Sequence, residues 1–221
     1  MTSGEDPRAG LGSLDAVLNH AWTQLGRALH DKHHGWRTPA LATIDAQGRP
    51  AVRTVVLRQA HPPGDHAGAS PGDILKNFGF LAVNTDPRSP KWAHLAERPW
   101  ASWCFWDGRR DQLRVEGPIT LHQDDEVADE AWRSTSPNSL RVHLAPEPPG
   151  ASSDRPTNNL PQDIEVRAPT QEELDAARGH FGLVRCRAVR MDFLRLHRDR
   201  ALRAGFAWDE SGKLTADWRA P

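Results

Sequence analysis

Short β-prone runs separated by turn residues dominate the chain after residue 39, and this order constrains the fold more than any other feature. The runs with strand character cover 40–45, 50–58, 78–84, 100–106, 112–122, 181–197, 203–209 and 213–218. They do not alternate with helices of regular length, as the strands of a doubly wound parallel sheet would. The pattern therefore predicts a mainly β (α+β) fold, an antiparallel barrel or sandwich with peripheral helices.

Four segments have helical character and surround these runs. An amphipathic helix is expected over 13–31, and a short one over 89–98 with Ser89 as N-cap and Pro90 at its first position. Further helices are expected over 123–133 and 171–179. Residues 59–73 and the proline-rich stretch 145–171 are expected to be irregular, the first as an exposed loop.

Length and charge set limits on the class of protein. A chain of 221 residues suits a single domain spanning 1–221, with a flexible start over 1–12. The 28 Lys and Arg residues balance 29 Asp and Glu residues, and eight arginines between 178 and 203 are explained by outward-facing strand positions. We therefore do not expect nucleic acid as a partner.

No membrane or secretory segment is expected either. No stretch approaches the ~20 consecutive apolar residues that a membrane helix needs, and the N-terminal sequence lacks the pattern of a signal peptide. The two cysteines suit reduced thiols. These features predict a cytoplasmic protein.

Two arginines frame the motif RTVVLR at 53–58. Two guanidiniums close together would suit a phosphate, because each can donate paired, charge-assisted hydrogen bonds. Their odd separation places Arg53 and Arg58 on opposite faces of a regular strand, unless a bulge or a strand end brings them together. Ordinary surface arginines remain the alternative explanation.

A second candidate anion site lies in NTDPRSPK at 84–91, where a strand ends and a helix begins. The amides of such a helix start, with Ser89, Arg88 and Lys91, could hold a phosphate, although many capped helices hold none. Further along, Gln112 begins a strand, and its neutral amide could contact the edge of a heterocycle. We expect no metal site, because no carboxylate or cysteine near the histidines in HDKHH (30–34) completes a recognisable set of ligands.

Taken in order, these motifs resemble the pyridoxamine 5′-phosphate oxidase-like flavoproteins. RTVVLR is followed about thirty residues later by NTDPRSPK, then by DQLRVEG, and finally by RAGFAW and DWRAP. The segment SPNSLRVHLAPEPPG at 136–150 is similar to the flavin-binding branch rather than to the vitamin B6 oxidases themselves. The resemblance implies a split β-barrel of antiparallel Greek-key strands, and a homodimer with FMN bound at the subunit interface.

The resemblance also assigns the residues that would bind the cofactor. No side chain is assigned as a general acid or base. The expected FMN contacts are Arg53, Thr54, Val55, Val56, Leu57, Arg58, Asn84, Thr85, Ser89, Lys91, Gln112 and Arg203. At the last position Arg200 is a rival.

The sequence departs from the oxidases where they bind their substrate phosphate. Glu130, Ser134 and Asn138 replace a Tyr, an Arg and a Ser, and an acid at that place would repel a phosphate. The Gln-Ser pair near the flavin falls at Glu147 and Pro148, and the flavin-side Trp falls at Leu194. The resemblance thus implies an FMN-dependent oxidoreductase with a different, unidentified small-molecule substrate. The alternative is a flavin-binding or sensing protein without turnover.

Overall fold

In the computed structural model, ten antiparallel strands form two sheets that share one long strand. The structure describes residues 6, 9–64, 77–161, 164 and 167–221. The first sheet has the order β10-β9-β8-β6-β5-β1-β2, and the second runs from β6 through β7 and β4 to β3. The strands are β1 (Ala40–Ile44), β2 (Pro50–Thr54), β3 (Gln59–His61), β4 (Phe80–Thr85), β5 (Trp100–Trp106), β6 (Asp111–His122), β7 (Gly182–Arg187), β8 (Arg190–Arg195), β9 (Leu202–Trp208) and β10 (Leu214–Arg219).

Strand β6 connects the two sheets by changing its partner halfway along. Its residues 111–116 pair with β8 in the first sheet, and its residues 119–122 pair with β7 in the second. The change occurs at Gly117, where a Cβ atom would lie 1.7 Å from the carbonyl oxygen of Arg187. Only glycine fits such a close approach of two backbones.

The segment 50–58 also passes from one sheet to the other, which corrects the prediction of a single strand. Strand β2 ends at Thr54, and β3 begins in the second sheet at Gln59. Between them, the amide of Leu57 donates to the carbonyl of Arg37, and the amide of Arg58 donates to the carbonyl of Ala82. The predicted run 181–197 likewise divides into β7 and β8.

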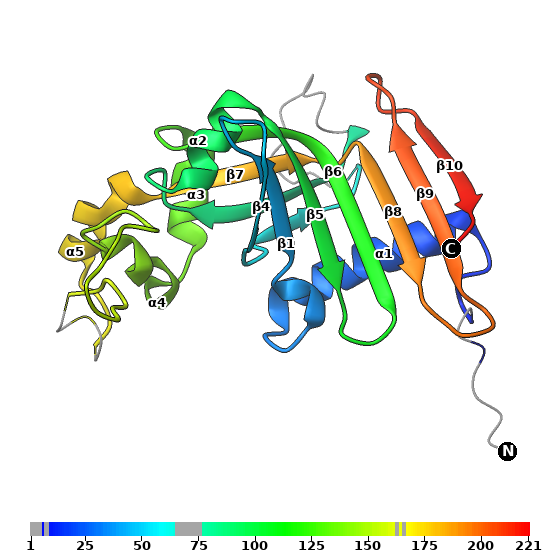
Figure 1. Cartoon of the computed structure of the whole chain (residues 1–221), viewed down its shortest axis with the longest axis horizontal. Helices are drawn as coiled ribbons and strands as arrows, with labels where there is room; N and C mark the ends of the chain where they lie inside the picture. The colour runs from blue at the N-terminus through cyan, green and yellow to red at the C-terminus, as the bar shows by residue number, and fades with distance from the viewer. Residues whose placement is uncertain (1–5, 7–8, 65–76, 162–163, 165–166) are drawn as a thin grey trace, which may run out of the picture.

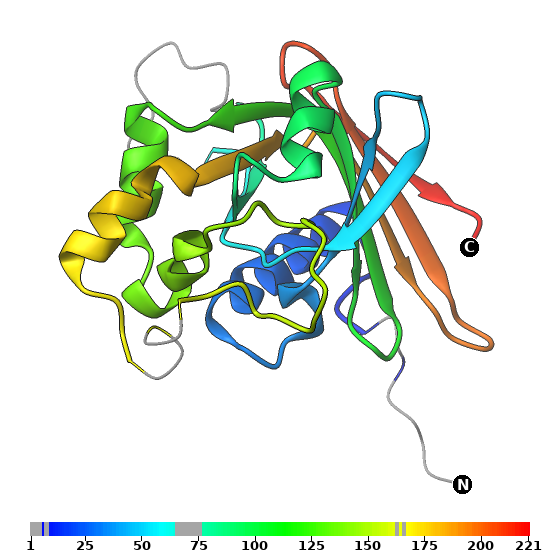
Figure 2. The same ribbon diagram turned by 60° about the vertical axis from the view of Figure 1, so that its left-hand side comes forward.

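The helices lie on one side of the first sheet and at one end of the molecule. Helix α1 runs behind the sheet, whereas α3, α4 and α5 gather beside β7 (Figures 1 and 2). The helices are α1 (Leu14–His30), α2 (Pro90–Glu97), α3 (Glu126–Ser134), α4 (Pro137–Leu140) and α5 (Gln171–Ala177), with 3-10 turns η1 (Gly35–Arg37), η3 (Arg141–Leu144) and η4 (Arg178–His180). The four predicted helices are confirmed.

The main core fills the space between α1 and the inner face of the sheets. Its largest fully buried side chains include Trp36, Trp103, Phe105, Phe193 and Phe206. A second cluster packs α3, α4 and α5 against β4 and β7. The alternation of buried and exposed residues along β5 and β6 leaves the opposite, outer face of the first sheet open to solvent.

A buried ion pair fastens α1 to the sheet. Arg195 donates to both carboxylate oxygens of Asp111, at 2.6 and 2.5 Å, and the side chains are 5% and 8% exposed. His20 on α1 lies 3.3 Å from the same carboxylate. The pair thus connects the start of β6, the end of β8 and the middle of α1.

Two predicted irregular segments differ in what the structure describes. The first begins as β3 and continues to residue 64, and its remainder lies outside the described residues. The proline-rich segment has no helix or strand among its described residues from 145 to 170. Of the predicted flexible start, 1–5 and 7–8 lie outside the described residues.

Candidate functional site

A polar cluster, here called the Arg53 cluster, forms where β2 faces the junction of β4 and α2. It consists of Thr43, Arg53, Thr85, Ser89 and Lys91. The Arg53 guanidinium donates to the Thr43 hydroxyl at 2.7 Å. The Lys91 ammonium donates to the Ser89 hydroxyl at 3.1 Å, and that hydroxyl lies 3.4 Å from the hydroxyl of Thr85. The cluster therefore unites four of the residues predicted to bind the cofactor.

The electrostatics of the cluster favour an anion. Burial lowers the pKa of Lys91, and the nearby charge of Arg53 lowers it further, while Asp86 opposes both effects. Burial also lowers the pKa of Arg53. Two partly buried cations that repel each other would both be stabilised by a bound phosphate.

The start of α2 supplies further donors. Ser89 is the N-cap of α2, yet its hydroxyl makes no capping hydrogen bond, because it faces Lys91 and Thr85 instead. Pro90 occupies the first turn of the helix, as predicted. The hydroxyl of Ser89 is thus placed to donate to an anion beside the helix N-terminus.

Arg88 does not belong to this cluster, which corrects the expectation that it helps to hold the anion. Its guanidinium donates to Oδ1 of Asp86 at 3.1 Å and to Oδ2 at 2.7 Å. It also donates to the carbonyl oxygens of Ala145 and Pro146, at 2.9 Å each. Arg88 therefore holds the proline-rich segment against the start of α2.

Arg58 and Asn84 lie apart from the Arg53 cluster, in a cavity of about 550 Å³ between the end of α1 and the α3–α4 connection. We call it the α1–α4 cavity. Asn84 donates to the hydroxyl of Thr135 at 3.0 Å. The cavity is lined by Leu29, Lys32, Arg37, Leu57, Arg58, Gln59, Asn84, Ala131, Ser134, Thr135, Ser136, Asn138 and Ser139. The strand end after Thr54 thus does not reunite the two arginines of RTVVLR.

The four residues between these arginines form the path from one site to the other. Val55 and Leu57 are buried in the core, whereas Thr54 and Val56 are exposed. They connect the Arg53 cluster to the α1–α4 cavity, in the part of the chain that passes from the first sheet to the second, which we call the crossing segment.

Gln112 and Arg203 lie on the outer face of the first sheet. Register places Gln112 beside Trp106 and Leu194, and Leu194 beside Arg203. Arg53 is on the other side of the sheet, because its register partner Leu41 faces the core. One protomer therefore does not bring these two predicted contacts to the Arg53 cluster.

Arg203, the predicted flavin contact near the end of the chain, pairs with Asp192. Asp192, whose side chain is 10% exposed, lies 3.1 Å from Arg203, 3.2 Å from Arg114 and 3.3 Å from Arg219. Arg200, the rival residue, lies in the turn between β8 and β9, 3.2 Å from Asp6. Arg203 shares its face of the sheet with Gln112, because both residues pair with Leu194.

Several arginines of the stretch 178–203 make ion pairs or aromatic contacts within the fold. Arg178 pairs with Asp129, and Arg195 with Asp111. Arg187 lies over the ring of Phe78, at 4.6 Å. These three of the eight arginines of this stretch thus have partners within the fold.

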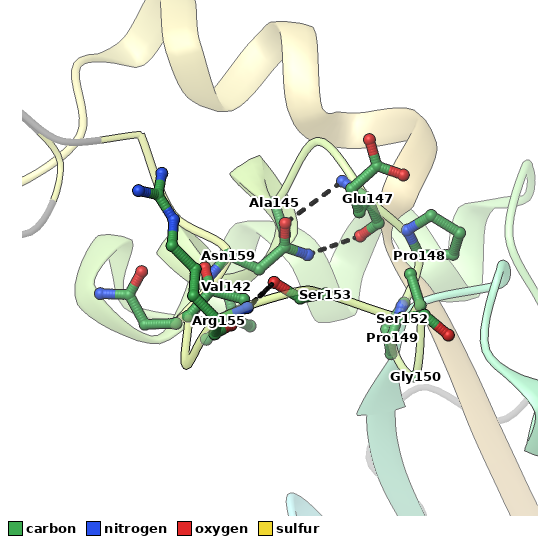
Figure 3. Close-up of a pocket in the computed structure, with 13 residues that line it drawn as sticks. Val142, Ala145, Glu147, Pro148, Pro149, Gly150, Ser152, Ser153, Arg155 and Asn159 are labelled. Carbon is green, nitrogen blue, oxygen red and sulfur yellow. Dashed lines mark hydrogen bonds between the residues drawn. The ribbon is translucent and has the colours of Figure 1, made fainter.

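The proline-rich segment encloses a separate cavity of about 490 Å³ (Figure 3). Asn159 supports its wall by donating to the carbonyl of Glu147 at 2.7 Å, and it adopts a left-handed backbone with φ of 58°. Glu147 and Pro148, which align with the flavin-side Gln-Ser pair, line this cavity and not the Arg53 cluster.

Sequence reasoning missed several residues beside these sites. Thr43, which accepts from Arg53, stands in no motif. Asp86, which influences the pKa of Lys91, lies within NTDPRSPK but was not singled out there. Lys32 and Arg37 reach the α1–α4 cavity from the end of α1 and from η1. For Lys32 and Arg37, the only hint in the sequence was the basic composition of residues 27–37.

The described part of the chain contains neither a cluster of metal ligands nor a membrane-spanning helix. There, no group of three or more His, Cys, Asp or Glu side chains is placed to hold a metal ion. None of the described helices is long and apolar enough to cross a bilayer.

Two antiparallel sheets that share the long strand β6 define a split β-barrel. Residues 19–123 match the family model described as pyridoxamine 5′-phosphate oxidase, FMN-binding domain. The resemblance that the motifs predicted is confirmed over that region.

Relatives in this family include enzymes with different names. The pyridoxine/pyridoxamine 5′-phosphate oxidase of Anaeromyxobacter dehalogenans is 34% identical over 149 residues, which cover 67% of this chain and 63% of that protein. The dihydrophenazinedicarboxylate synthase of Pseudomonas chlororaphis is 32% identical over 117 residues, covering 51% of this chain and 43% of that protein. The matched regions thus span less than two thirds of either relative.

A solved structure shares the architecture over nearly the whole chain. It is a pyridoxamine 5′-phosphate oxidase-related, FMN binding protein from Nostoc punctiforme, with a TM-score of 0.66 and 23% identity. The match covers 93% of this chain and 96% of that one. The predicted split β-barrel fold is confirmed.

Proposed function

We propose that this chain binds FMN between two copies of itself and acts as an FMN-dependent oxidoreductase on a small molecule. The observation that carries the proposal is the Arg53 cluster, in which the cations Arg53 and Lys91 and the hydroxyls of Thr85 and Ser89 lie together. A phosphate carries close to two negative charges and several acceptor oxygens, so it complements two cations and two hydroxyls.

The fit extends from the phosphate to the ring. In this proposal the phosphate lies at the Arg53 cluster and the ring follows the segment 54–57 toward Arg58. Val56, the exposed apolar side chain of this segment, offers apolar surface to a flat ring. A bound flavin supplies hydride and electron transfer, while the protein orients the substrate and keeps water from the ring.

The homodimer follows from the separation of the predicted contacts. Gln112 and Arg203 face outward from the sheet, away from the Arg53 cluster, so they reach a flavin only if it is held by another copy. The same outer face exposes large apolar side chains: Val52 is 64% exposed, Trp100 47% and Trp106 41%. Exposed apolar area of this kind marks an interaction surface.

The test begins with the purified protein and its flavin. We expect a visible absorption spectrum of bound flavin, and release of FMN on denaturation, identified by mass. If the protein is colourless, we expect added FMN to bind and to lose its fluorescence. Failure of both experiments would refute the cofactor assignment.

Substitutions then locate the phosphate site. Lys91→Ala should weaken FMN binding by about tenfold or more, because it removes a charge-assisted hydrogen bond to the phosphate. Riboflavin, which lacks the phosphate, should bind the wild type and this variant alike. Lys213→Ala on the β9–β10 turn is the matched control and should bind FMN as the wild type does. Equal FMN affinity of Lys91→Ala and the wild type would contradict the site.

Turnover separates an oxidoreductase from a flavin-binding or sensing protein. The loaded protein is reduced anaerobically with a nicotinamide donor and then exposed to oxygen or a panel of organic acceptors. Reoxidation that depends on an added small molecule supports the enzyme. A flavin that binds tightly but reacts with none of the panel supports binding alone.

A further inference from the structure

Arg88 lies in the turn between β4 and α2, next to the Arg53 cluster but outside it. Its guanidinium donates to Oδ1 of Asp86 at 3.1 Å and to Oδ2 at 2.7 Å, and its backbone amide donates to Oδ1 at 2.8 Å. The side chain of Asp86 is 7% exposed and that of Arg88 25%. One arginine therefore holds a buried carboxylate from both its side chain and its backbone.

The proline-rich segment fixes the orientation of this guanidinium. The same group donates to the carbonyl oxygens of Ala145 and Pro146, at 2.9 Å each. A planar guanidinium with carbonyls on one side and a carboxylate on the other can turn only by breaking several hydrogen bonds. The pair of Arg88 and Asp86 is therefore preorganised.

Asp86 is an acid that acts on the Arg53 cluster. The amide of Ser89 donates to the backbone carbonyl of Asp86 at 3.0 Å, so both residues belong to one turn. Burial and the charge of Arg53 lower the pKa of Lys91, whereas the charge of Asp86 raises it. An Asp86 carboxylate without a partner would attract the Lys91 ammonium and repel a phosphate.

Arg88 offsets this charge. Burial by itself would raise the pKa of Asp86, but the hydrogen bonds and the charge of Arg88 outweigh burial and lower it. The carboxylate is therefore ionised at neutral pH and held by Arg88. Lys91 instead donates to the hydroxyl of Ser89 at 3.1 Å, and in the described part of the chain no ion pair joins Lys91 to Asp86.

We propose that Arg88 is a positioning residue for anion binding at the Arg53 cluster: it retains the Asp86 carboxylate, so that Lys91 stays beside Ser89 and is free to donate to a phosphate. That the phosphate belongs to FMN rests on the proposed function, whereas the effect of Arg88 on Lys91 does not. Because Arg88 acts through Asp86, neutralising Asp86 should restore what the loss of Arg88 removes.

The protonation of Lys91 tests the proposal without any cofactor. Acetic anhydride modifies only the neutral amine, so the rate of acetylation against pH, followed by peptide mass mapping, gives the pKa of Lys91. Arg88→Gln should raise this pKa, because the charge of Asp86 then acts unopposed. Arg88→Gln combined with Asp86→Asn should return it to the wild-type value or below. Lys213, in the same protein, is the internal standard.

Flavin affinity, measured by the loss of flavin fluorescence, tests the connection to the phosphate. Arg88→Gln should weaken FMN binding about tenfold, because Lys91 is drawn toward Asp86. Riboflavin should bind this variant within about twofold of the wild type, since it has no phosphate to use Lys91. The double variant should bind FMN within about threefold of the wild type.

Arg167→Gln is the matched control. Arg167 likewise donates to a carboxylate, that of Glu173, and to a backbone carbonyl, that of Ala168. It lies beside the start of α5 and not beside the Arg53 cluster. This variant should bind FMN as the wild type does.

Two further variants separate positioning from a purely structural anchor. The double variant also lacks the contacts to the proline-rich segment, so a loss caused by release of that segment would persist in it. Asp86→Asn alone should lower the pKa of Lys91 and bind FMN at least as tightly as the wild type does. Weaker FMN binding by a folded Asp86→Asn would contradict the proposal. Circular dichroism confirms that each variant is folded.

The outcomes distinguish the two proposals. If the wild type binds no FMN, but the pKa of Lys91 rises in Arg88→Gln and falls back in the double variant, the proposed function fails and the role of Arg88 stands. If the wild type binds FMN, the role of Arg88 is refuted when Arg88→Gln leaves the pKa of Lys91 unchanged, or when the double variant binds FMN as weakly as Arg88→Gln. The cofactor site then stands.

Discussion

Replacing Asp111 with the isosteric Asn should destabilise this protein strongly, because Asp111 is buried and paired with Arg195. The substitution keeps the shape of the side chain but removes the charge that offsets Arg195. Both side chains are at least 90% buried, and the guanidinium donates twice to the carboxylate. The amide cannot accept both hydrogen bonds in the same way, so a buried cation is left without its counter-charge.

The expected magnitude follows from burial. Removing one partner of a buried ion pair costs about 3–5 kcal/mol of unfolding free energy, because the other charge stays desolvated. His20 adds a hydrogen bond to the same carboxylate, which connects the loss to α1. A domain of this size commonly has a total stability of about 5–15 kcal/mol, so the change is readily measured.

The pH dependence gives an independent check. Burial by itself would raise the pKa of Asp111, but the hydrogen bonds from His20 and Arg195 outweigh burial and lower the pKa below its ordinary value of 3.8. The ionised carboxylate therefore stabilises the folded state fully above that value, and the contribution is lost as pH falls through the folded-state pKa. The difference between wild type and variant should shrink below about pH 4.

Urea denaturation followed by tryptophan fluorescence measures the effect at pH 7 and at pH 3.5. Asp124→Asn, at an exposed position at the start of the α3 region, is the matched control and should change stability by less than ~0.5 kcal/mol. A loss below ~1 kcal/mol for Asp111→Asn, with no change between the two pH values, would refute the reasoning.

Three further predictions concern the shared strand, the outer face and the thiols. Gly117→Ala should destabilise the fold by about 3 kcal/mol or prevent folding, because its Cβ would meet the Arg187 carbonyl; thermal melting measures this. Val52→Glu should shift the protein from dimer to monomer in sedimentation velocity, and an unchanged dimer would place the interface elsewhere. Burial raises the pKa of the Cys186 thiol to about 12, so iodoacetamide at pH 8 should modify Cys104 first and Cys186 only after unfolding, as peptide mass mapping would show.

Much of the fold was predictable because its signals are local. The amphipathic helix at 14–30, the capped start of α2 and the hairpin of β5 and β6 follow from periodicity, an N-cap serine and turn residues. The prediction of one strand over 50–58 was wrong because the chain passes from one sheet to the other within this segment. The run 50–58 has uniform strand character, and only the pairing with β1 on one side and β4 on the other divides it.

The candidate site was predictable in part for the same reason. Ser89 and Lys91 lie two residues apart in one motif, so their proximity was expected. Arg53 and Arg58 are also close in sequence. They lie in different sites because the chain passes from one sheet to the other between them. Arg88 is a cation that could bind an anion, but its guanidinium already donates hydrogen bonds to Asp86 and to the proline-rich segment.

The sequence alone determined most of the elements, the resemblance to the family and the cationic character of two motifs, because these depend on residue type and short spacing. Tertiary structure alone decided which charges share a site. Lys32, Arg37 and Arg58 come from separate elements, and their convergence without an acid depends on how α1, the crossing segment and the α3–α4 connection pack together. Long-range packing sets the distances between charges, and no local pattern encodes those distances.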